Sequence, residues 1–302
     1  MRNQEIDITV ITVNYNGLND TCEFLDSWYN NIKSCSFEII VIDNGSRNNE
    51  SKLLKEKYPE IISIRSDKNL GFAGANNIGI EKAKGKFLFF LNNDIIIIED
   101  NINKLITRLS SSSSIGALSP LIRDNNNERT IQFAGFTKLS SITLRNHTIG
   151  EGCTDSSLFP SSPIPYLHGA AMLCKKEAVD KIGYMDTDYF LYYEELDWCE
   201  KFHKHGYELW YDPDFELIHK NSSSTGQDSP LKIYYLSRNR LLFAYKNRRG
   251  IELFFIILYC YLIVLPKNIL KALINWRFDA IKAYYKGTID FNKLIMKKRK
   301  KI

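Results

Sequence analysis

Two clusters of polar residues in the first third of the chain have the composition of a site for a phosphate-bearing ligand. The first combines Val13-Asn14-Tyr15-Asn16 with Asp43-Asn44-Gly45-Ser46, and both segments follow runs rich in β-branched residues. The second, Asn69–Gly79 (NLGFAGANNIG), has glycines that permit close approach of a ligand to the backbone. The helix predicted there would offer free N–H groups to an anion. Alone, the segment is weak evidence because it matches neither G-x-G-x-x-G nor a Walker loop.

Two further clusters contain carboxylates. Asn92-Asn93-Asp94 follows the hydrophobic run KFLFFL and ends in a side chain that suits a hard cation. Glu194-Glu195-Leu196-Asp197-Trp198 has three acids in four positions at the start of a predicted helix, and His219 follows later. A carboxylate can accept the proton of a hydroxyl nucleophile. Acids in a first helical turn also complement the helix dipole, so a structural role is the alternative.

Alternating strands and helices are predicted to position these residues. Repeated β-α-β units imply a mostly parallel sheet with helices on both faces, and ligands bind at the carboxyl ends of its strands. Asp43 and Asp94 fall at such ends. Apolar runs predict strands at 6–15, 37–42, 61–65 and 86–91, and helix signals predict helices from 19 or 20 to 31, at 49–58 and at 74–84.

The middle and later parts of the chain are predicted to extend this α/β domain. One amphipathic helix, Glu99–Leu109, precedes a strand near Gly116–Ile122 and a loop at 150–165. Regular structure returns with a strand at 170–174 (AAMLC), helices at 176–182 and 194–205, and short strands at 208–211 and 216–219.

The composition is that of a globular protein. Hydrophobic residues make up 44% of the 302 residues and charged residues 25%, which excludes collagen-like, disordered and multi-span membrane classes. The net charge of +5 is uneven, because residues 231–302 hold 17 Lys and Arg against 3 Asp and Glu. This excess favours an anionic partner, either lipid or nucleic acid. Six cysteines without a C-x-x-C pair, and no apolar signal region, predict a cytosolic protein with free thiols.

Residues 231–302 are expected to form a basic helical extension to a domain at 1–230. Its apolar run Ile251–Leu265 has 15 residues, fewer than the roughly 20 that a spanning helix needs, and Pro266 and Lys267 follow. We therefore expect a helix that lies in the plane of a membrane interface, with packing on the main domain as the alternative. The cluster Lys297–Lys301 would strengthen attachment to anionic lipid.

Taken in order, these clusters resemble family 2 glycosyltransferases of the GT-A fold, especially the bacterial rhamnosyltransferase branch. The resemblance covers nearly the whole chain and is carried by ITVNYN, VIDNGS, NLGFAGANNIG, FLNND, GAAMLCKKEAVDKIGYMDTDYFLYYEELDWCEK, IHKNSSST and YYLSRNRLLFAYKN. It implies inverting transfer of a sugar, such as rhamnose, from a nucleotide-diphosphate donor to a hydroxyl of a glycan in surface polysaccharide synthesis. It also implies a divalent cation (Mg²⁺ or Mn²⁺) and a polyprenyl-diphosphate-linked acceptor. The expected location is the cytoplasmic face of the cell membrane, on an anionic surface and without nucleic acid.

The resemblance also assigns donor-binding roles to individual positions. Asp43 matches the acid that binds the donor base, and Asn76 faces the donor. The nucleotide pocket is lined by Val13, Asn14 and Tyr15.

Other positions match the metal-binding and catalytic residues of the family. Asp94 matches the last acid of the D-x-D motif, which holds the metal, and His219 would assist it. The motif is Asn92-Asn93-Asp94 here, so two of its positions are neutral. The family's Glu-Asp pair is Glu194-Glu195, which makes Glu195 the expected catalytic base and leaves Asp197 as a rival.

Two other functions compete with this one. A sugar nucleotidyltransferase would need Arg or Lys in a glycine-rich loop after the first strand, whereas the segment Asn14–Asp20 has no basic residue. A non-catalytic carbohydrate-binding or scaffold protein derived from a transferase is supported by the neutral residues of Asn92-Asn93-Asp94. The intact acids at 194, 195 and 197 disfavour it.

Overall fold

The computed structural model describes residues 6–126, 129–221 and 229–299. Parts of the predicted loop at 124–129, of the motif IHKNSSST and of the basic cluster Lys297–Lys301 lie outside the described residues. The chain forms two compact units. The first unit is Met1–Thr137, His147–Phe190 and Glu194–Ser222, and the second unit is Lys138–Asn146, Leu191–Tyr193 and Ser223–Ile302. Two short segments that precede residue 230 in the chain thus belong to the second unit, which no sequence pattern indicated.

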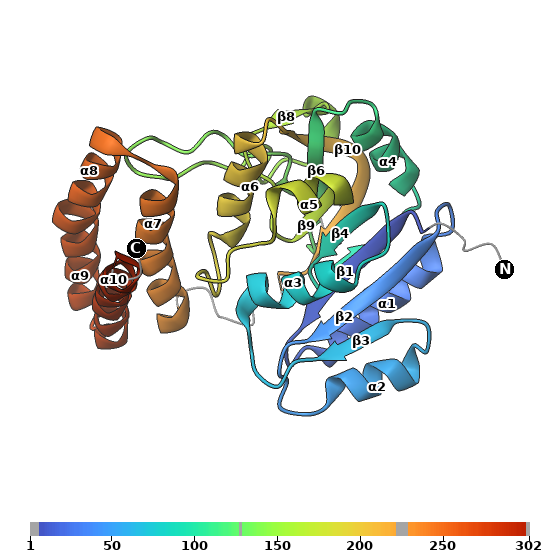
Figure 1. Ribbon diagram of the computed structural model, residues 1–302, viewed down its shortest axis with the longest axis horizontal. Coiled ribbons are helices and arrows are strands. Elements are labelled where there is room, and N and C mark those ends of the chain that lie inside the picture. Colours follow the sequence, from blue (N-terminus) through green and yellow to red (C-terminus); the bar gives the residue numbers. More distant parts are fainter. Residues whose placement is uncertain (1–5, 127–128, 222–228, 300–302) are drawn as a thin grey trace. The chain divides into compact units, whose positions relative to one another are not determined.

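The first unit is built on one large sheet with the strand order β3-β2-β1-β4-β9-β6-β10-β5 (Figure 1). The strands β3, β2, β1 and β4 are parallel, whereas β9 runs antiparallel between β4 and β6. Because β10 is parallel to β6, it has the same direction as β4. The strands are β1 Ile8–Asn14, β2 Phe37–Asp43, β3 Ile62–Arg65, β4 Phe87–Leu91, β5 Ile95–Ile97, β6 Ile115–Asp124, β7 Ile131–Phe133, β8 Ser162–Ile164, β9 Ala171–Lys175 and β10 Glu208–His219.

The core of this unit surrounds β1 and β4. Every residue of β1 except the half-buried Val13 is buried, as expected for a parallel strand covered on both faces. The indole of Trp28, on α1 (Leu18–Asn31), packs against Phe37 and Phe89, with ring centroids 5.5 and 6.3 Å apart. This packing holds α1 against β2 and β4.

The other helices of the first unit follow the predicted order, with one earlier start. The helix α3 begins at Gly71, three residues before the predicted Gly74. Gly71 has a φ of 73°, and a Cβ there would lie 2.0 Å from the carbonyl oxygen of Phe190. The Phe72 N–H donates to that oxygen at 2.9 Å, so a tertiary contact sets this start. The helices are α2 Glu50–Lys57, α3 Gly71–Lys82, α4 Ile102–Ser110, α5 Lys176–Ile182 and α6 Glu194–Lys204, and residues 156–158 form the 3₁₀ turn η1.

The two short strands predicted at 208–211 and 216–219 are a single strand, β10. Its register against β6 shifts between Asp212 and Glu216, around Pro213. Proline removes a ladder donor and is tolerated at such irregularities, so the strand continues past it. The continuous strand brings His219 to the sheet edge at which β4 ends.

The second unit is helical in the part of residues 229–302 that the structure describes (Figure 1). The helix α10 (Phe278–Arg299) packs along α7 (Pro230–Asn247), where Gly287 allows close approach because a Cβ there would lie 2.7 Å from the carbonyl oxygen of Tyr234. The hydroxyl of Tyr234 donates to Asp290 on α10 at 3.0 Å. The helices are α7 Pro230–Asn247, α8 Gly250–Tyr259, the π-helical segment η2 Cys260–Val264, α9 Leu265–Ile274 and α10 Phe278–Arg299.

The predicted end of the apolar helix at Leu265 is wrong. α8, η2 and α9 form one continuous helix of 25 residues, Gly250–Ile274, with a mean hydropathy of 2.1 and only 11% burial over its most apolar window. Pro266 lacks an N–H and so cannot donate a helical hydrogen bond. The π-helical segment before it accommodates this loss, because the Leu265 N–H donates to the carbonyl of Cys260, five residues earlier. Among the described residues this is the one helix long and apolar enough to cross a membrane, by length and composition alone.

Candidate active site

Four chain segments meet at one edge of the sheet in the first unit. β1 and β2 end together, because Asn14 and Asp43 are register partners. β4 ends next to them at Leu91, and β10 ends at His219. The antiparallel β9 begins at this edge, so residues 168–170 also lie there; the Asn92 N–H donates to the carbonyl of Ala170 at 3.0 Å. The topology therefore brings Asn14, Asp43 and His219 to the edge at which β4 ends.

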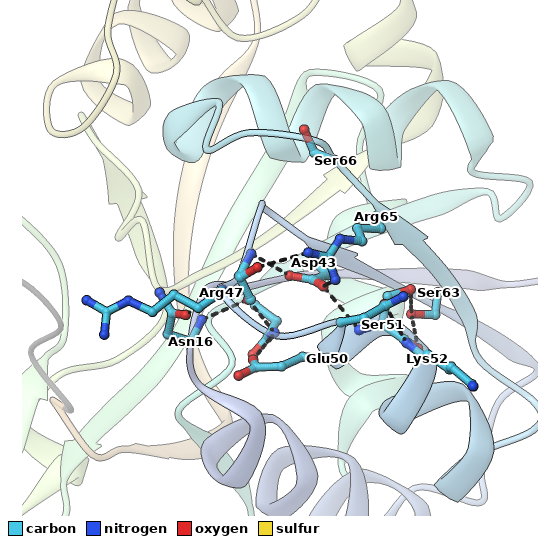
Figure 2. Close-up of polar contacts among 12 residues, drawn as sticks. Asn16, Asp43, Arg47, Glu50, Ser51, Lys52, Ser63, Arg65 and Ser66 are labelled. Atoms are coloured by element: carbon cyan, nitrogen blue, oxygen red, sulfur yellow. Dashed lines mark hydrogen bonds and ion pairs between the residues drawn. The ribbon is translucent and has the colours of Figure 1, made fainter.

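The carboxylate of Asp43 is completely buried at the end of β2. Its two oxygens accept hydrogen bonds from the backbone N–H groups of Ser46 at 3.0 Å and Ser51 at 3.1 Å. The Arg65 guanidinium lies 3.6 Å away, as Figure 2 shows. These contacts shape the turn between β2 and α2. The predicted contact between Asp43 and a donor base stays a prediction.

The residues at the end of β1 differ in whether a ligand could reach their side chains. Asn14 is buried; its amide donates to Glu50 at 2.7 Å and accepts from Thr21 at 2.8 Å. Val13 is half-buried, and Tyr15 is 44% exposed. Tyr15 is therefore the side chain of this trio that a ligand reaches most readily.

Asn76 lies in the glycine-rich segment and is buried in α3. Its amide donates to the Phe72 carbonyl one turn earlier, at 3.0 Å. The adjacent Asn77 connects α3 to Met185 through two hydrogen bonds, of 2.9 and 3.0 Å. This second amide fixes α3 against the segment that leads to α6, a role that no sequence signal indicated.

Asp94 and His219 are brought together although they are far apart in the sequence. His219 Nε2 lies 3.1 Å from Asp94 Oδ1, and both residues are buried at 7% exposure. The Asn92 amide lies 3.5 Å from the same imidazole nitrogen. The Asn93 amide instead donates to Thr21 Oγ1 at 2.9 Å and so connects the end of β4 to α1. Of the three residues Asn92-Asn93-Asp94, the first and last thus face His219.

A chain of hydrogen bonds sets the orientation of the His219 ring. Asp124 can only accept, so Asn221 donates to it through Nδ2 at 2.9 Å. Asn221 Oδ1 then accepts from Gln132 Nε2 at 2.9 Å, and Gln132 Oε1 faces His219 Nδ1 at 3.0 Å. His219 Nδ1 must therefore carry a proton, and Nε2 is the nitrogen that faces Asp94.

This arrangement places Nε2 of His219 and Oδ1 of Asp94 in contact. Either a proton or a metal cation between them is needed to make the contact favourable. Carboxylate and imidazole together suit Mn²⁺ among other divalent ions. Within the described ranges no group of three His, Cys, Asp or Glu side chains is close enough to hold a metal. The pair thus fits a cation that takes its other ligands from a bound diphosphate.

The three acids at the start of α6 differ in environment. Glu194 and Asp197 are buried at 4% exposure, and the hydroxyl of Tyr189 donates to Asp197 at 3.2 Å. Burial and the nearby Asp197 raise the pKa of Tyr189 well above its usual value, so the phenol stays protonated. Glu195 is half-buried, and its Cγ would lie 3.5 Å from a Cβ at Gly169. Glu195 is therefore the most accessible acid of the three and lies over the 168–170 segment.

His168 connects this segment to the Asp94–His219 pair. Its ring lies 6.2 Å from that of His219 and stacks on Phe136 at 5.9 Å. Burial, with repulsion from His219, lowers the pKa of His168 to about 3, so the ring is neutral. Its Nδ1 accepts from the Ala170 N–H at 3.2 Å, which fixes the turn that holds Gly169 beneath Glu195.

Sequence reasoning missed Gln132, Asn221 and Gly169. Gln132 and Asn221 are isolated polar residues without a motif, and only the pairing of β7 with β6 and of β6 with β10 brings them beside His219. The small residues at 169–171 were a usable signal for Gly169, because close approach of a ligand or a side chain favours glycine.

Comparison with known proteins identifies the family of the chain. The family model described as glycosyl transferase family 2 matches residues 9–183, more than half of the chain. The chain is 25% identical over 252 residues to a low-salt glycan biosynthesis hexosyltransferase, Agl10, of Haloferax volcanii (78% of this chain, 75% of that protein). It is 26% identical over 211 residues to an N-acetylglucosaminyl-diphospho-decaprenol L-rhamnosyltransferase of Mycobacterium tuberculosis (63% of this chain, 68% of that protein).

Solved structures share the fold at low sequence identity. The mannosyltransferase PcManGT of Pyrobaculum calidifontis, in complex with GDP-Man and Mn²⁺, superposes with a TM-score of 0.56 at 16% identity, over 94% of this chain and 74% of that one. GalNAc-T7, with UDP, GalNAc and Mn²⁺, gives 0.61 at 16% identity over 81% of this chain, which spans about half (51%) of the GalNAc-T7 chain. The chain belongs to glycosyl transferase family 2 and is a glycosyltransferase of the GT-A fold.

Proposed function

We propose that the protein transfers a sugar, with inversion, from a nucleotide-diphosphate donor to a hydroxyl of a lipid-linked glycan during surface polysaccharide synthesis. The observation that carries this proposal is the meeting of Glu195, Gly169 and the Asp94–His219 pair at one sheet edge. A single displacement at this edge needs a base for the acceptor and charge stabilisation for the leaving group, and no enzyme nucleophile.

The donor nucleotide is proposed to lie over the ends of β1 and β2. Tyr15 and Val13 are the accessible groups there, and Asn14 and Asp43 hold the backbone around them through buried hydrogen bonds. Asn76 fixes the first turns of α3 in the same manner. The first N–H groups of α3 are bonded within the protein, so the proposed contribution of this helix to diphosphate binding is the positive end of its dipole.

Asp94 and His219 are proposed to hold a divalent cation, Mn²⁺ or Mg²⁺. Two structural neighbours of the same fold are complexes with Mn²⁺. When bound, the cation would neutralise the charge that develops on the leaving nucleoside diphosphate. Asn92 and Asn93 carry no charge, so the bound diphosphate would supply the remaining negatively charged ligands.

Glu195 is proposed as the base that accepts the proton of the acceptor hydroxyl. Its partial exposure supports this role, whereas Asp197 is buried and accepts from Tyr189. Glu194 is buried at the helix start and is proposed to support the position of Glu195. General-base catalysis of this kind contributes about 10²–10⁴-fold to the rate.

The acceptor is proposed to be a glycan on a polyprenyl diphosphate at the cytoplasmic face of the cell membrane. One relative acts, by its name, on a decaprenol-linked N-acetylglucosaminyl diphosphate and transfers L-rhamnose. Residues 231–302 are proposed to form the membrane-associating extension, since they are basic and contain the exposed apolar helix Gly250–Ile274. Anionic lipid attracts such a segment by about 1 kcal/mol for each basic residue near the surface.

The function is tested by incubating the full-length protein with Mn²⁺ and a panel of UDP-, dTDP- and GDP-sugars. Release of the nucleoside diphosphate is measured with and without a prenyl-diphosphate-linked N-acetylglucosamine. We expect release from one donor class, stimulated by the acceptor, and an anomeric configuration opposite to that of the donor. Absence of release from every donor, or retention of configuration, would refute the proposal.

A further inference from the structure

A cavity of about 310 Å³ lies within the second unit. Residues of α7, η2, α9 and α10 line it together with Arg145 and Tyr193 from the two short segments of the same unit. Its volume is at the lower end of the range for small-ligand sites, about 300–1,000 Å³. No residue assigned above to the donor, the cation or the base lines this cavity.

The cavity is lined by three cations, Arg145, Lys232 and Arg240, and by no acid. Arg240 is the most buried of them, at 8% exposure. Its guanidinium donates to the Thr143 carbonyl and lies 5.9 Å from the ring of Tyr259, and its buried Nε has no hydrogen-bond partner. A buried guanidinium without a carboxylate partner favours an anionic ligand.

The acids of the second unit are engaged elsewhere. Among its described residues they number three, and each pairs with a cation outside the cavity. Glu252 pairs with Arg248 at 3.3 Å, Asp279 with Arg277 at 2.9 Å and Asp290 with Lys293 at 3.8 Å. The positive charge of the cavity is therefore not neutralised within the described part of this unit.

The remaining wall of the cavity is largely apolar. Leu236, Leu241, Val264 and Leu265 contribute to it. Two of these residues belong to the helix Gly250–Ile274, whose neighbouring side chains Leu262 and Ile263 are 65% and 54% exposed. A cavity lined both by three cations and by residues of an exposed apolar helix suits a molecule that has an anionic group and a hydrocarbon chain.

We infer that this cavity binds the phosphate or diphosphate group of a lipid. Arg145, Lys232 and Arg240 would contact the phosphate oxygens, and the hydrocarbon chain would run along η2 and α9. The inference rests on the proposed function, in which the acceptor is a lipid-linked glycan, and it adds the site at which the lipid phosphate is held.

The test measures binding by calorimetry with three probes: farnesyl diphosphate, farnesol and inorganic pyrophosphate. The first carries both chemical features of the expected ligand, and the others carry one each. The full-length protein is compared with a double variant, Arg145→Gln and Lys232→Gln. Both positions are at least partly exposed, so the fold should be retained. The control is Lys282→Gln with Lys286→Gln, which removes the same charge from exposed positions of α10 that do not line the cavity.

We expect farnesyl diphosphate to bind more tightly than either other probe. The cavity variant should lose about tenfold or more in affinity, since it removes two charge-assisted contacts, and the control should keep the wild-type value. Arg240→Lys, which keeps the charge but not the guanidinium fork, should also weaken binding.

Equal losses in the control and cavity variants would overturn the site. Pyrophosphate binding as tight as farnesyl diphosphate binding would overturn the lipid as ligand. Binding of a nucleoside diphosphate with Mn²⁺ by the wild-type protein tests the proposed function separately.

Discussion

Replacement of Gln132 by methionine should weaken cation binding although Gln132 would not touch the cation. The Gln132 side chain accepts from His219 Nδ1 at 3.0 Å and is itself held by Asn221 at 2.9 Å. Methionine has a similar length but no comparable acceptor, so the His219 ring loses the contact that keeps its proton on Nδ1. The imidazole can then rotate or place its proton on Nε2, and either change removes the lone pair from the side of Asp94.

The expected loss of Mn²⁺ affinity follows from the role of the hydrogen bond between Gln132 and His219. A neutral hydrogen bond contributes about 0.5–1.5 kcal/mol, and loss of a partner that orients a metal-binding histidine typically costs 10–100-fold in metal affinity. We therefore expect Mn²⁺-dependent nucleoside diphosphate binding to weaken by about 10–100-fold, or about 1.4–2.7 kcal/mol. Gln132→Glu keeps an acceptor for His219 Nδ1 and should bind within a few-fold of wild type.

Calorimetric titration of Mn²⁺ into protein with a saturating nucleoside diphosphate measures the effect. The thermal midpoint of each variant checks the fold, and His219→Ala provides the value for complete loss of the ligand. If Gln132→Met binds Mn²⁺ as tightly as wild type while His219→Ala does not, the hydrogen-bond chain does not control His219 and the reasoning fails.

Two substitutions probe the rest of the site, and one experiment with the unchanged protein probes membrane association. Glu195→Gln should lower turnover by at least about 10²-fold with donor affinity nearly intact, because glutamine cannot accept the proton; activity near wild type in a steady-state assay would reassign the base. Asp197→Ala should instead lower stability by about 1–3 kcal/mol, since the buried Tyr189 hydroxyl loses its acceptor; denaturant unfolding at an unchanged midpoint would contradict this. Full-length protein should sediment with anionic liposomes at low salt and be released as the salt concentration rises, because basic residues supply much of the attraction. Protein that stays in the supernatant at low salt would argue against membrane association.

Local chemistry made much of the fold predictable from the sequence. The β-branched and apolar runs of β1, β2 and β4 predict buried strands, and the turn residues after them predict where those strands end. The polar clusters at 13–16, 43–46 and 92–94 therefore had to lie at strand ends, and parallel strands place such ends at one sheet edge. These patterns predicted a mostly parallel α/β sheet with a ligand site at one edge, whereas the GT-A fold and the glycosyltransferase family were expected from the resemblance of the ordered motifs to that family.

Boundaries that depend on distant contacts were less predictable. The start of α3 at Gly71 depends on the Phe190 carbonyl, which is more than a hundred residues away. The helix Gly250–Ile274 continues past Pro266 because a π-helical segment accommodates the missing N–H, a backbone adjustment that residue propensities do not encode.

The sequence by itself determined which polar residues lie at strand ends and helix starts, because local patterns fix the positions of those ends and starts. Tertiary structure alone decided how those residues combine. β10 had to run in the direction of β4 before His219 could reach Asp94, and β7 had to pair with β6 before Gln132 could orient that histidine. The two acids also differ in burial: Asp197 is buried and hydrogen-bonded, whereas Glu195 is half-buried. Two residues two positions apart on one helix point in different directions, so their surroundings differ.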